Sequence, residues 1–345
     1  MEQMRHEVRE QPDVLRALLE KEYPTIRAIA QELRQRDIRH VLMVARGSSG
    51  NAATYAKYLF GTANRLPVAM AAPSLYTVYQ TPPSLQNTLV VAISQSGASP
   101  DIIAVVEDAR AQGAPTIAMT NAPDSPLAQA AERVIYLQAG QERAVAATKT
   151  YTAELMAVAL LSVALNDDAR ALEQLRRVPE AVARTLEVEE SIQRGAERYR
   201  YMTGCAVIGR GYNYASALEV ALKLKELTYT GATPYSSADF LHGPIAVVEP
   251  GFPVLLIAPG GRVLPDLMSL MAELQQREAE LLVISDDPQP LEHAQRPIRL
   301  PVTVDEWLSP IVAVVPGQLL AYHLAIAKGL DPDKPRGLRK VTQTR

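Results

Sequence analysis

The amino-acid sequence predicts an α/β fold in which one unit, a parallel sheet with helices on both faces, occurs twice. Short apolar segments alternate with segments of helical length, which is typical of parallel sheets covered by crossover helices. Apolar runs end in Arg-Gly at Arg46 and again at Arg210, 164 positions later. Two further pairs of strand ends keep this spacing, namely Ile93 with Ile257, 164 apart, and Asn121 with Asp286, 165 apart. Three landmarks at one spacing indicate a two-copy duplication.

The individual elements follow from apolar runs, helical periodicity and proline positions. The N-terminal residues 1–36 are expected to be helical, punctuated by Pro12 and Pro24. Strands are expected at 41–45, 89–93 and 116–121 in the first copy and at 206–209, 254–257 and 281–286 in the second. Helices are expected at 52–60, 102–112, 215–229 and 264–278. Residues 151–200 have helical character throughout, with Pro179 opening a new helix.

These elements divide the chain into five segments. An N-terminal helical segment (1–36) precedes the first α/β domain (37–165), a helical linker (166–198), the second α/β domain (199–330) and a C-terminal tail (331–345). A length of 345 residues fits two domains, and 48% hydrophobic residues supply enough apolar material for two cores.

Composition narrows the class of protein. A net charge of −3 offers no basic excess for binding nucleic acid. No unbroken apolar run reaches the roughly 18–20 residues of a membrane span, and the charged start is unlike a signal peptide. The single cysteine, Cys205, precludes an internal disulfide and is expected to be a small buried hydrophobe. We therefore expect a cytoplasmic protein with neither nucleic acid nor membrane as a partner, and with no metal or cofactor.

The strongest local signal is the serine-rich run Ser94–Ser99, which directly follows the apolar segment 89–93. Ser99 is a plausible N-cap for the next helix, with Pro100 at its first position. Hydroxyl groups, exposed backbone N–H groups and a helix N-terminus together favour an anion, and phosphate is the natural ligand. The alternative interpretation is an ordinary Ser/Gly loop before a capped helix.

The second copy holds a denser set of titratable residues. Lys223 and Glu226 are three positions apart on a predicted helix and therefore share a face. His242 lies in a turn-prone His-Gly-Pro sequence, where an imidazole can be presented to a ligand. A carboxylate can act as a base and a histidine can exchange protons near neutral pH. The alternatives are a surface ion pair for Lys223 with Glu226 and a structural role for His242.

The remaining candidates are weaker on pattern alone. The histidines other than His242 have no such sequence neighbours, and the tail from residue 331 is polar and irregular, as in a frayed end.

Six stretches, in the same order along nearly the whole chain, carry a family resemblance. They are Ala45–Ser49 (ARGSS), Ile93–Gly97 (ISQSG), Val145–Thr150 (VAATKT), Ala221–Glu226 (ALKLKE), Leu241–Pro244 (LHGP) and Asp333–Lys340 (DKPRGLRK). The chain resembles the double sugar-isomerase (SIS) domain family. It is similar to the isomerase half of glutamine–fructose-6-phosphate aminotransferase and, more closely, to stand-alone glucosamine-6-phosphate deaminases of the same double domain. The resemblance implies two flavodoxin-like, three-layer αβα subdomains.

The resemblance also implies a binding site for a hexose or hexosamine phosphate. The residues matching the phosphate contacts are Ser94, Gln95, Ser96 and Ser99, and those matching the sugar contacts are Gly47, Ser48, Ser49, Val145 and Ala147. Ala147 departs from the aminotransferase pattern, which has a hydroxyl there. In the second copy, Ala258–Gly261 replaces the serine loop, so we expect one sugar site per chain.

The catalytic set implied by the resemblance consists of four residues. His242 matches the histidine that opens the sugar ring and is donated by a neighbouring subunit, which implies a homodimer. Glu226 matches the base that moves a proton between C1 and C2, and Lys223 would assist the developing oxygen charge. Lys340 matches a tail lysine that forms a Schiff base with the open-chain ketose, the tail acting as a lid.

Departures from the aminotransferase pattern favour another branch of the family. Asp239 stands where aminotransferases have a glutamate, and Leu241 where they have a lysine. The sequence also shows no glutaminase domain with its nucleophilic cysteine. The expected reaction is therefore conversion of glucosamine 6-phosphate and water to fructose 6-phosphate and ammonium.

Several alternatives stay open. One is an aminotransferase-type sugar isomerase without the glutaminase domain, and others are an aldose–ketose isomerase and a fructosamine-phosphate deglycase. A non-catalytic sugar-phosphate sensor is the alternative from outside the enzymes. A nucleotide-cofactor enzyme, suggested by Gly209-Arg210-Gly211, is set aside because no strand-end acid follows near residues 230–232.

Overall fold

The computed structural model describes residues 2–338 and 340, which fold into two compact units. The first-repeat unit contains Asp13–Glu142, Lys149–Arg177 and, from the described tail, Lys340. The second-repeat unit contains the residues up to Pro12, Arg143–Thr148 and Val178–Leu338. Neither unit is continuous along the chain.

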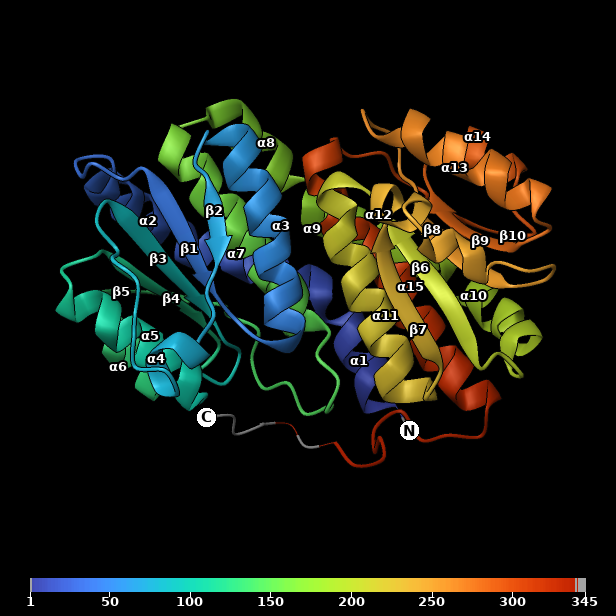
Figure 1. Ribbon diagram of the computed structural model, residues 1–345, viewed down its shortest axis with the longest axis horizontal. Coiled ribbons are helices and arrows are strands. Elements are labelled where there is room, and N and C mark those ends of the chain that lie inside the picture. The colour runs from blue at the N-terminus through green and yellow to red at the C-terminus, as the bar shows by residue number, and fades with distance from the viewer. Residues whose placement is uncertain (1, 339, 341–345) are drawn as a thin grey trace. The chain divides into compact units, whose positions relative to one another are not determined.

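The first-repeat unit is built on a five-stranded parallel sheet (Figure 1). Its strands are β1 (His40–Val44), β2 (Val68–Met70), β3 (Thr88–Ile93), β4 (Thr116–Thr120) and β5 (Arg133–Tyr136). They are arranged in the order β2-β1-β3-β4-β5, with Val44 of β1 opposite Ala92 of β3. Every residue of β3 and β4 is buried, as their unbroken apolar sequences predict for central parallel strands.

Helices cover both faces of this sheet. On one face, α5 (Pro100–Ala111) and α6 (Pro126–Ala130) pack on Val44, Val90 and Ala92, with α4 (Ser74–Thr77) beside α5. On the other face, α3 (Gly47–Ala63) contacts β1, β2 and β3, and α7 (Lys149–Asn166) packs against α3. The helices α2 (Gln11–Leu33) and α8 (Ala169–Arg176) complete the elements of this part of the chain.

The second-repeat unit repeats this topology. Its strands are β6 (Gly204–Gly209), β7 (Gly231–Ser236), β8 (Pro253–Ile257), β9 (Glu280–Ser285) and β10 (Arg296–Arg299). All pair in parallel, in the order β10-β9-β8-β6-β7, which is the order of the first sheet read from its other edge. The duplication and the three-layer α/β class predicted from the sequence are therefore confirmed.

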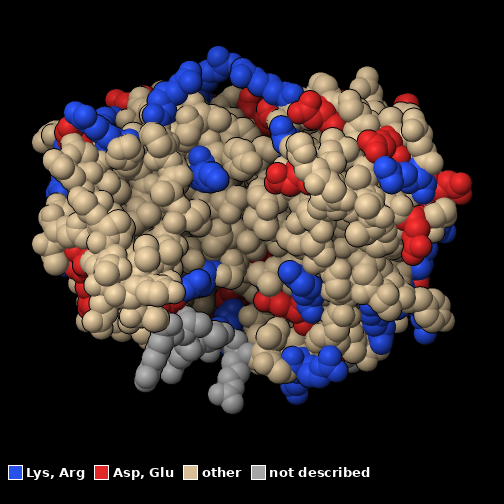
Figure 2. Space-filling view, in the orientation of Figure 1, with Lys and Arg blue, Asp and Glu red and all other residues tan. Residues whose placement is uncertain are grey.

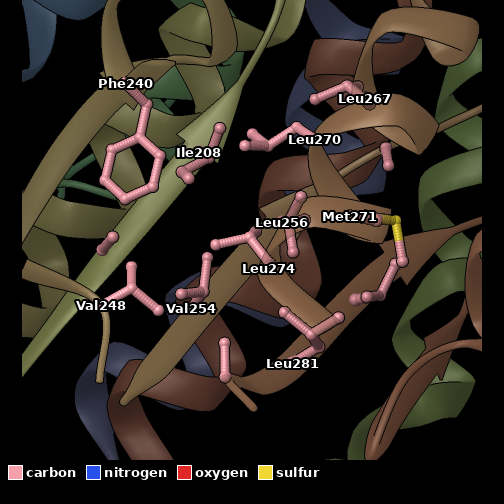
Figure 3. Close-up of a cluster of buried hydrophobic side chains, with 14 of the residues drawn as sticks. Ile208, Phe240, Val248, Val254, Leu256, Leu267, Leu270, Met271, Leu274 and Leu281 are labelled. Carbon is pink, nitrogen blue, oxygen red and sulfur yellow. The ribbon is translucent and has the colours of Figure 1, made fainter. Parts of the chain in front are cut away.

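One face of the second sheet packs against α12 (Ser237–Leu241) and α13 (Leu264–Gln276). In Figure 3, Ile208 of the sheet lies between Phe240 of α12 and Leu270 of α13, and Val254 of the sheet lies beside Val248. On the opposite face, α11 (Tyr214–Thr228) contacts β6 and packs against α15 (Ser309–Ala327). Other helices are α1 (Gln3–Arg9), α9 (Val178–Thr185), α10 (Glu189–Ala196) and α14 (Pro288–Glu292). Short 3-10 turns occupy Leu186–Val188, Glu197–Tyr199, Gly211–Asn213, Pro244–Val247 and Glu306–Leu308.

The expectation that no apolar segment is long enough to span a membrane needs one correction, at helix α15. Together with the preceding turn, Glu306–Ala327 is long and apolar enough to cross a membrane by composition, because a few polar residues are tolerated in such a span. Of its most apolar window, 89% is buried inside the fold. A helix that is apolar on all sides and enclosed by protein is a core helix.

Several local predictions are confirmed and two are wrong. Ser99 is the N-cap of α5 with Pro100 in its first turn, and Pro179 lies in the first turn of α9. Pro24, expected to punctuate the N-terminal helices, lies inside α2. Gly47–Ser49, which lie before the helix expected at 52–60, form the first turn of α3, with Gly47 at φ +53°.

In Figure 2, Lys and Arg side chains form a band along the upper edge of the drawn face, and elsewhere on it charged side chains of both signs are scattered among uncharged residues. Cys205 is buried at the start of β6, and burial raises the pKa of its thiol to about 12.

The packing of α15 on α11 depends on Gly317. A Cβ atom at this position would collide with the side chain of Val220 on α11. We expect Gly317→Ala to lower the free energy of unfolding by about 1–3 kcal/mol, although alanine alone favours a helix. The midpoint of denaturant unfolding measures this change.

The matched control is Gly61→Ala in α3, where an added Cβ meets no atom within 4 Å. This variant should be as stable as the parent or up to about 1 kcal/mol more stable. Equal effects of the two substitutions would contradict the close approach of α15 to α11.

Candidate active site

The first-repeat candidates lie at the point where the sheet topology reverses direction. From β1 the chain passes through α3 to β2 on one side, and from β3 it passes through α5 to β4 on the other. Because β1 and β3 are neighbouring parallel strands, the segments after them emerge side by side at one edge of the sheet. Ligands of doubly wound sheets bind in the crevice at such a switch point.

The serine loop after β3 is held in one conformation by its glycine. Gly97 is buried at φ +59°, and a Cβ atom there would collide with Ser125. The Gly97 N–H donates to Ser94 Oγ at 3.2 Å, and the Gly97 carbonyl accepts from Leu127 N at 3.0 Å. Only glycine fits this left-handed, crowded position, so the loop is fixed before any ligand arrives.

Several donors of this loop are unused. Among the described residues, no hydrogen-bond partner exists for the backbone N–H groups of Gln95, Ser96 and Ser99. Ser99 occupies the N-cap of α5, yet its hydroxyl makes no capping bond. Unpaired N–H groups beside a helix N-terminus form an anion-binding nest. This arrangement argues against the alternative of an ordinary capped loop.

The predicted sugar contacts fall in both units. Ser49 is buried, and its hydroxyl donates to Glu154 Oε1 of α7 at 2.7 Å. Gly47 and Ser48 lie with it in the first turn of α3, in the first-repeat unit. Val145 and Ala147 are half-buried and belong to the second-repeat unit. Their contacts with a sugar stay predictions.

Helix α11 holds a lysine between two carboxylates. The Nζ atom of Lys223 lies 2.6 Å from Glu226 Oε2 and 3.3 Å from Glu219 Oε1. The side chains of Lys223 and Glu219 are 1% and 0% exposed, whereas that of Glu226 is 22% exposed. The interpretation as a surface ion pair is therefore wrong. Charges are buried only when they are paired, and here the one carboxylate that reaches solvent is the predicted base.

Glu219 is a candidate that the sequence analysis missed. It precedes Lys223 by four positions, a spacing that brings a glutamate and a lysine together on one helix face. The signal was therefore present, but only the burial of both residues distinguishes it from a pair on the helix surface.

His242 is exposed at the end of α12. It lies in a turn next to Gly243, which has φ +129°. Within residues 2–338 and 340, no hydrogen bond or ion pair involves its imidazole. A structural histidine would be held by neighbours, so the structural alternative is not supported in this chain. The neighbouring Leu241 is also exposed, to 45%.

Lys340 is docked rather than frayed. Its Nζ atom lies 2.6 Å from Oε2 of Glu142, whose side chain is fully buried. Glu142 also accepts from the backbone N–H and the hydroxyl of Thr150, at 3.1 and 2.7 Å, where α7 begins. The tail lysine of the first-repeat unit therefore has a defined carboxylate partner that the sequence did not reveal.

The tail before it is also anchored. The Asp333 carboxylate accepts the N–H groups of Gln3 and Met4 at 3.1 and 2.9 Å, at the start of α1. Burial works to raise the pKa of Asp333, but these hydrogen bonds outweigh it and hold the pKa below its usual value. The Arg336 guanidinium lies 4.5 Å from the ring centre of Tyr229. The frayed-end interpretation is wrong for the described part of the tail.

Known proteins resemble this chain over nearly its full length. It is 37% identical over 347 residues to the glutamine–fructose-6-phosphate aminotransferase (isomerizing) of Thermococcus kodakarensis, a match that covers 98% of this chain and 57% of the relative. The chain thus spans a little over half the length of the curated relatives it matches.

Two solved structures share the whole architecture. The C-terminal domain of glucosamine-fructose-6-phosphate aminotransferase from Francisella tularensis is 28% identical, with a TM-score of 0.87 over 96% of this chain and 98% of that one. Glucosamine-6-phosphate deaminase from Thermotoga maritima is 25% identical, with a TM-score of 0.77 over 99% of this chain and 100% of that one.

A sequence model of the SIS domain matches residues 33–164 and again residues 205–328. These ranges contain the ten strands of the two sheets described above, apart from Gly204 at the start of β6. By this double match and by its duplicated topology, the chain belongs to the SIS domain family.

Proposed function

We propose that the protein is an amino-sugar phosphate deaminase that converts glucosamine 6-phosphate and water to fructose 6-phosphate and ammonium. The observation that carries the proposal is the buried Glu219–Lys223–Glu226 set of α11, in which Glu226 alone reaches solvent. A partly exposed carboxylate fixed by a buried cation suits a base that must move a proton between two carbons.

The serine loop is assigned to the phosphate group. A phosphate carries its negative charge on oxygens that accept several hydrogen bonds at once. The unused N–H groups of Gln95, Ser96 and Ser99 supply such donors, and the N-terminus of α5 adds a favourable dipole. Because the loop is already ordered by Gly97, little conformational freedom is lost on binding.

The proton shuttle balances without a redox partner. After ring opening, assigned to His242, Glu226 takes the proton from C2 while the electrons of that bond form a C1–C2 double bond and the carbonyl oxygen gains a proton. The resulting enolamine is protonated at C1, which leaves an imine at C2. Water adds to the imine carbon, and ammonia leaves as the ketone forms. One carboxylate lying near both carbons performs both transfers.

The two lysines have separate roles in the proposal. Lys223 is enclosed between Glu219 and Glu226, so it orients the base and assists charge on the substrate oxygen from that fixed place. Lys340 has the amine that can condense with the C2 carbonyl of the ketose, and this requires release from Glu142.

A sugar isomerase of the aminotransferase type is the second candidate. It is favoured by the 37% identity to the Thermococcus kodakarensis aminotransferase. Between the two solved structures, the identity is 28% for the Francisella tularensis aminotransferase domain and 25% for the Thermotoga maritima deaminase. The proton shuttle is the same in both reactions, so the distinction lies in whether ammonium is released.

Replacing the base tests the reaction. Glu226→Gln should lower ammonium release from glucosamine 6-phosphate by about 10²–10⁴-fold, because the amide cannot accept the C2 proton. Ammonium and fructose 6-phosphate are measured in parallel. The exposed Glu249→Gln is the matched control and should keep full activity. Wild-type protein that releases no ammonium but exchanges the C1 hydrogen of fructose 6-phosphate with solvent would establish the isomerase instead.

Replacing Ser99 should affect ligand binding without affecting the stability of the fold. Its hydroxyl does not cap α5, so Ser99→Ala should leave the free energy of unfolding within about 0.5 kcal/mol of the parent. The same change should weaken fructose 6-phosphate binding about 10-fold, because a hydrogen bond to a charged oxygen is lost. Calorimetric titration and denaturant unfolding give the two values.

Asp168→Ala provides the opposite pattern. Asp168 caps α8 by accepting the N–H of Ala171 at 3.0 Å, so its loss should cost about 1 kcal/mol of stability and leave binding unchanged. If Ser99→Ala behaved in the same way as Asp168→Ala, the serine loop would be an ordinary cap.

We further propose that the enzyme works as a homodimer in which His242 serves the partner's site. Mixing His242→Ala chains with Glu226→Gln chains should then restore activity, because each hybrid dimer contains one site with both native residues. Exchange is verified with two affinity tags, and each variant alone is the control. Inactive hybrids with verified exchange would place His242 in the site of its own subunit.

A further inference from the structure

We propose that Arg46 is a phosphate-recognition residue, held beside the serine loop by the buried carboxylate of Asp101. The inference rests on the proposed function, because it assumes a phosphorylated ligand at this loop. Arg46 follows β1 and the serine loop follows β3, and these strands are paired in parallel at the switch point.

The contact that fixes Arg46 belongs to the helix that follows the serine loop. Arg46 Nε donates to Asp101 Oδ2 at 2.9 Å. Asp101 is the second residue of α5, directly after Pro100, and its other oxygen accepts the N–H of Ile102 at 3.0 Å. The guanidinium is therefore tied to the first turn of the helix whose N-terminus carries the unused loop donors.

The two partners of this ion pair differ in exposure. The Asp101 side chain is 1% exposed, whereas that of Arg46 is 54% exposed. Among the described residues, the Nη nitrogens of Arg46 have no partner. A fixed carboxylate thus holds one edge of the guanidinium, and the remaining donors face solvent. Such a fork can bind two phosphate oxygens at once.

Arg46 also neutralises the negative charge of Asp101. The Asp101 carboxylate lies in the first turn of α5 and would repel a phosphate anion placed at that N-terminus. The positive charge of Arg46, 2.9 Å away, compensates the carboxylate. With Arg46 present, the sum of the pair is neutral and the loop donors act on the ligand without an opposing charge.

The second repeat provides a comparison within the same chain. Arg210 and Asp266, 164 and 165 positions after Arg46 and Asp101, form the corresponding pair. There the Nε–Oδ2 distance is 3.8 Å and Asp266 is 64% exposed.

The loop that follows β8 in the second repeat also differs from the serine loop, because some of its N–H groups are already bonded. Two N–H groups here are bonded within the chain: Gly260 N donates to Asp286 Oδ1 at 2.8 Å, and Arg262 N, just after the loop, donates to Glu306 Oε2 at 3.0 Å. Arg46 is thus held at 2.9 Å beside a loop with unused donors, whereas Arg210 lies 3.8 Å from its aspartate beside a loop where protein carboxylates accept two N–H groups.

Binding measured without turnover tests the inference. Titration calorimetry with inorganic phosphate and with fructose 6-phosphate is applied to the full-length protein. Arg46→Met should weaken both ligands about 10–100-fold, and Arg46→Lys should be intermediate because it keeps the charge and loses the fork. In turnover, Arg46→Met should raise KM with kcat within a few-fold of the parent.

Arg210→Met is the matched control and should leave phosphate affinity unchanged. Arg46→Met that binds phosphate as tightly as the parent, whatever its thermal stability, would overturn the inference, as would equal losses in Arg46→Met and Arg210→Met. Wild-type protein that binds neither ligand would overturn it together with the phosphate site. Wild-type protein that binds both ligands but releases no ammonium would end the deaminase proposal alone and leave Arg46 to be judged by affinity.

Discussion

The parallel pairing of β1 with β3 is the constraint on which the first-repeat site depends. The chain leaves these neighbouring strands toward opposite sides of the sheet, so no crossover helix closes the edge between their carboxyl ends. The serine loop and the segment beginning at Arg46 both emerge at that edge. Their proximity follows from topology, and the glycine at Gly97 and the Arg46–Asp101 contact then fix the local geometry.

The two repeats share one topology but differ in where they carry charged residues and unused hydrogen-bond donors. Subtracting the 164-residue offset from Glu219, Lys223 and Glu226 gives Tyr55, Leu59 and Thr62 on α3. Tyr55 and Leu59 are buried. The first repeat thus combines an open anion loop with a helix that carries no charge at these three positions. The second repeat combines a charged helix with a loop at which two N–H groups donate to carboxylates of the same repeat. Under the proposed function, this division gives each chain one phosphate loop and one proton-transfer set.

Sequence patterns predicted what is local and periodic. The parallel sheets with helices on both faces were predicted from alternating apolar and helical segments. The N-cap position of Ser99 and the shared helix face of Lys223 and Glu226 follow from spacing of a few residues. The ion pair of Lys340 with Glu142 did not, because 198 residues separate the partners. The same holds for the buried carboxylate of Glu189, which lies 2.5 Å from Arg5 on α1 and 3.1 Å from His323 on α15. Burial lowers the pKa of His323 despite this neighbour. Charged side chains have no periodicity that reveals partners so distant in the chain, and only the folded backbone brings them together.

The comparison of α11 with α3 of the first repeat also indicates why α11 carries buried charges. Removing a lysine and a glutamate from water costs several kcal/mol per ion, and apolar residues of similar volume are often as good or better for stability. The first repeat uses that apolar solution, with Tyr55 and Leu59 at the corresponding positions of a helix in the same topology. The fold therefore does not require the charges of α11. Lys223 and Glu219 are kept fully buried while Glu226 alone of the three meets solvent, and the proposed function gives these two charges a role, which is to hold that carboxylate in place.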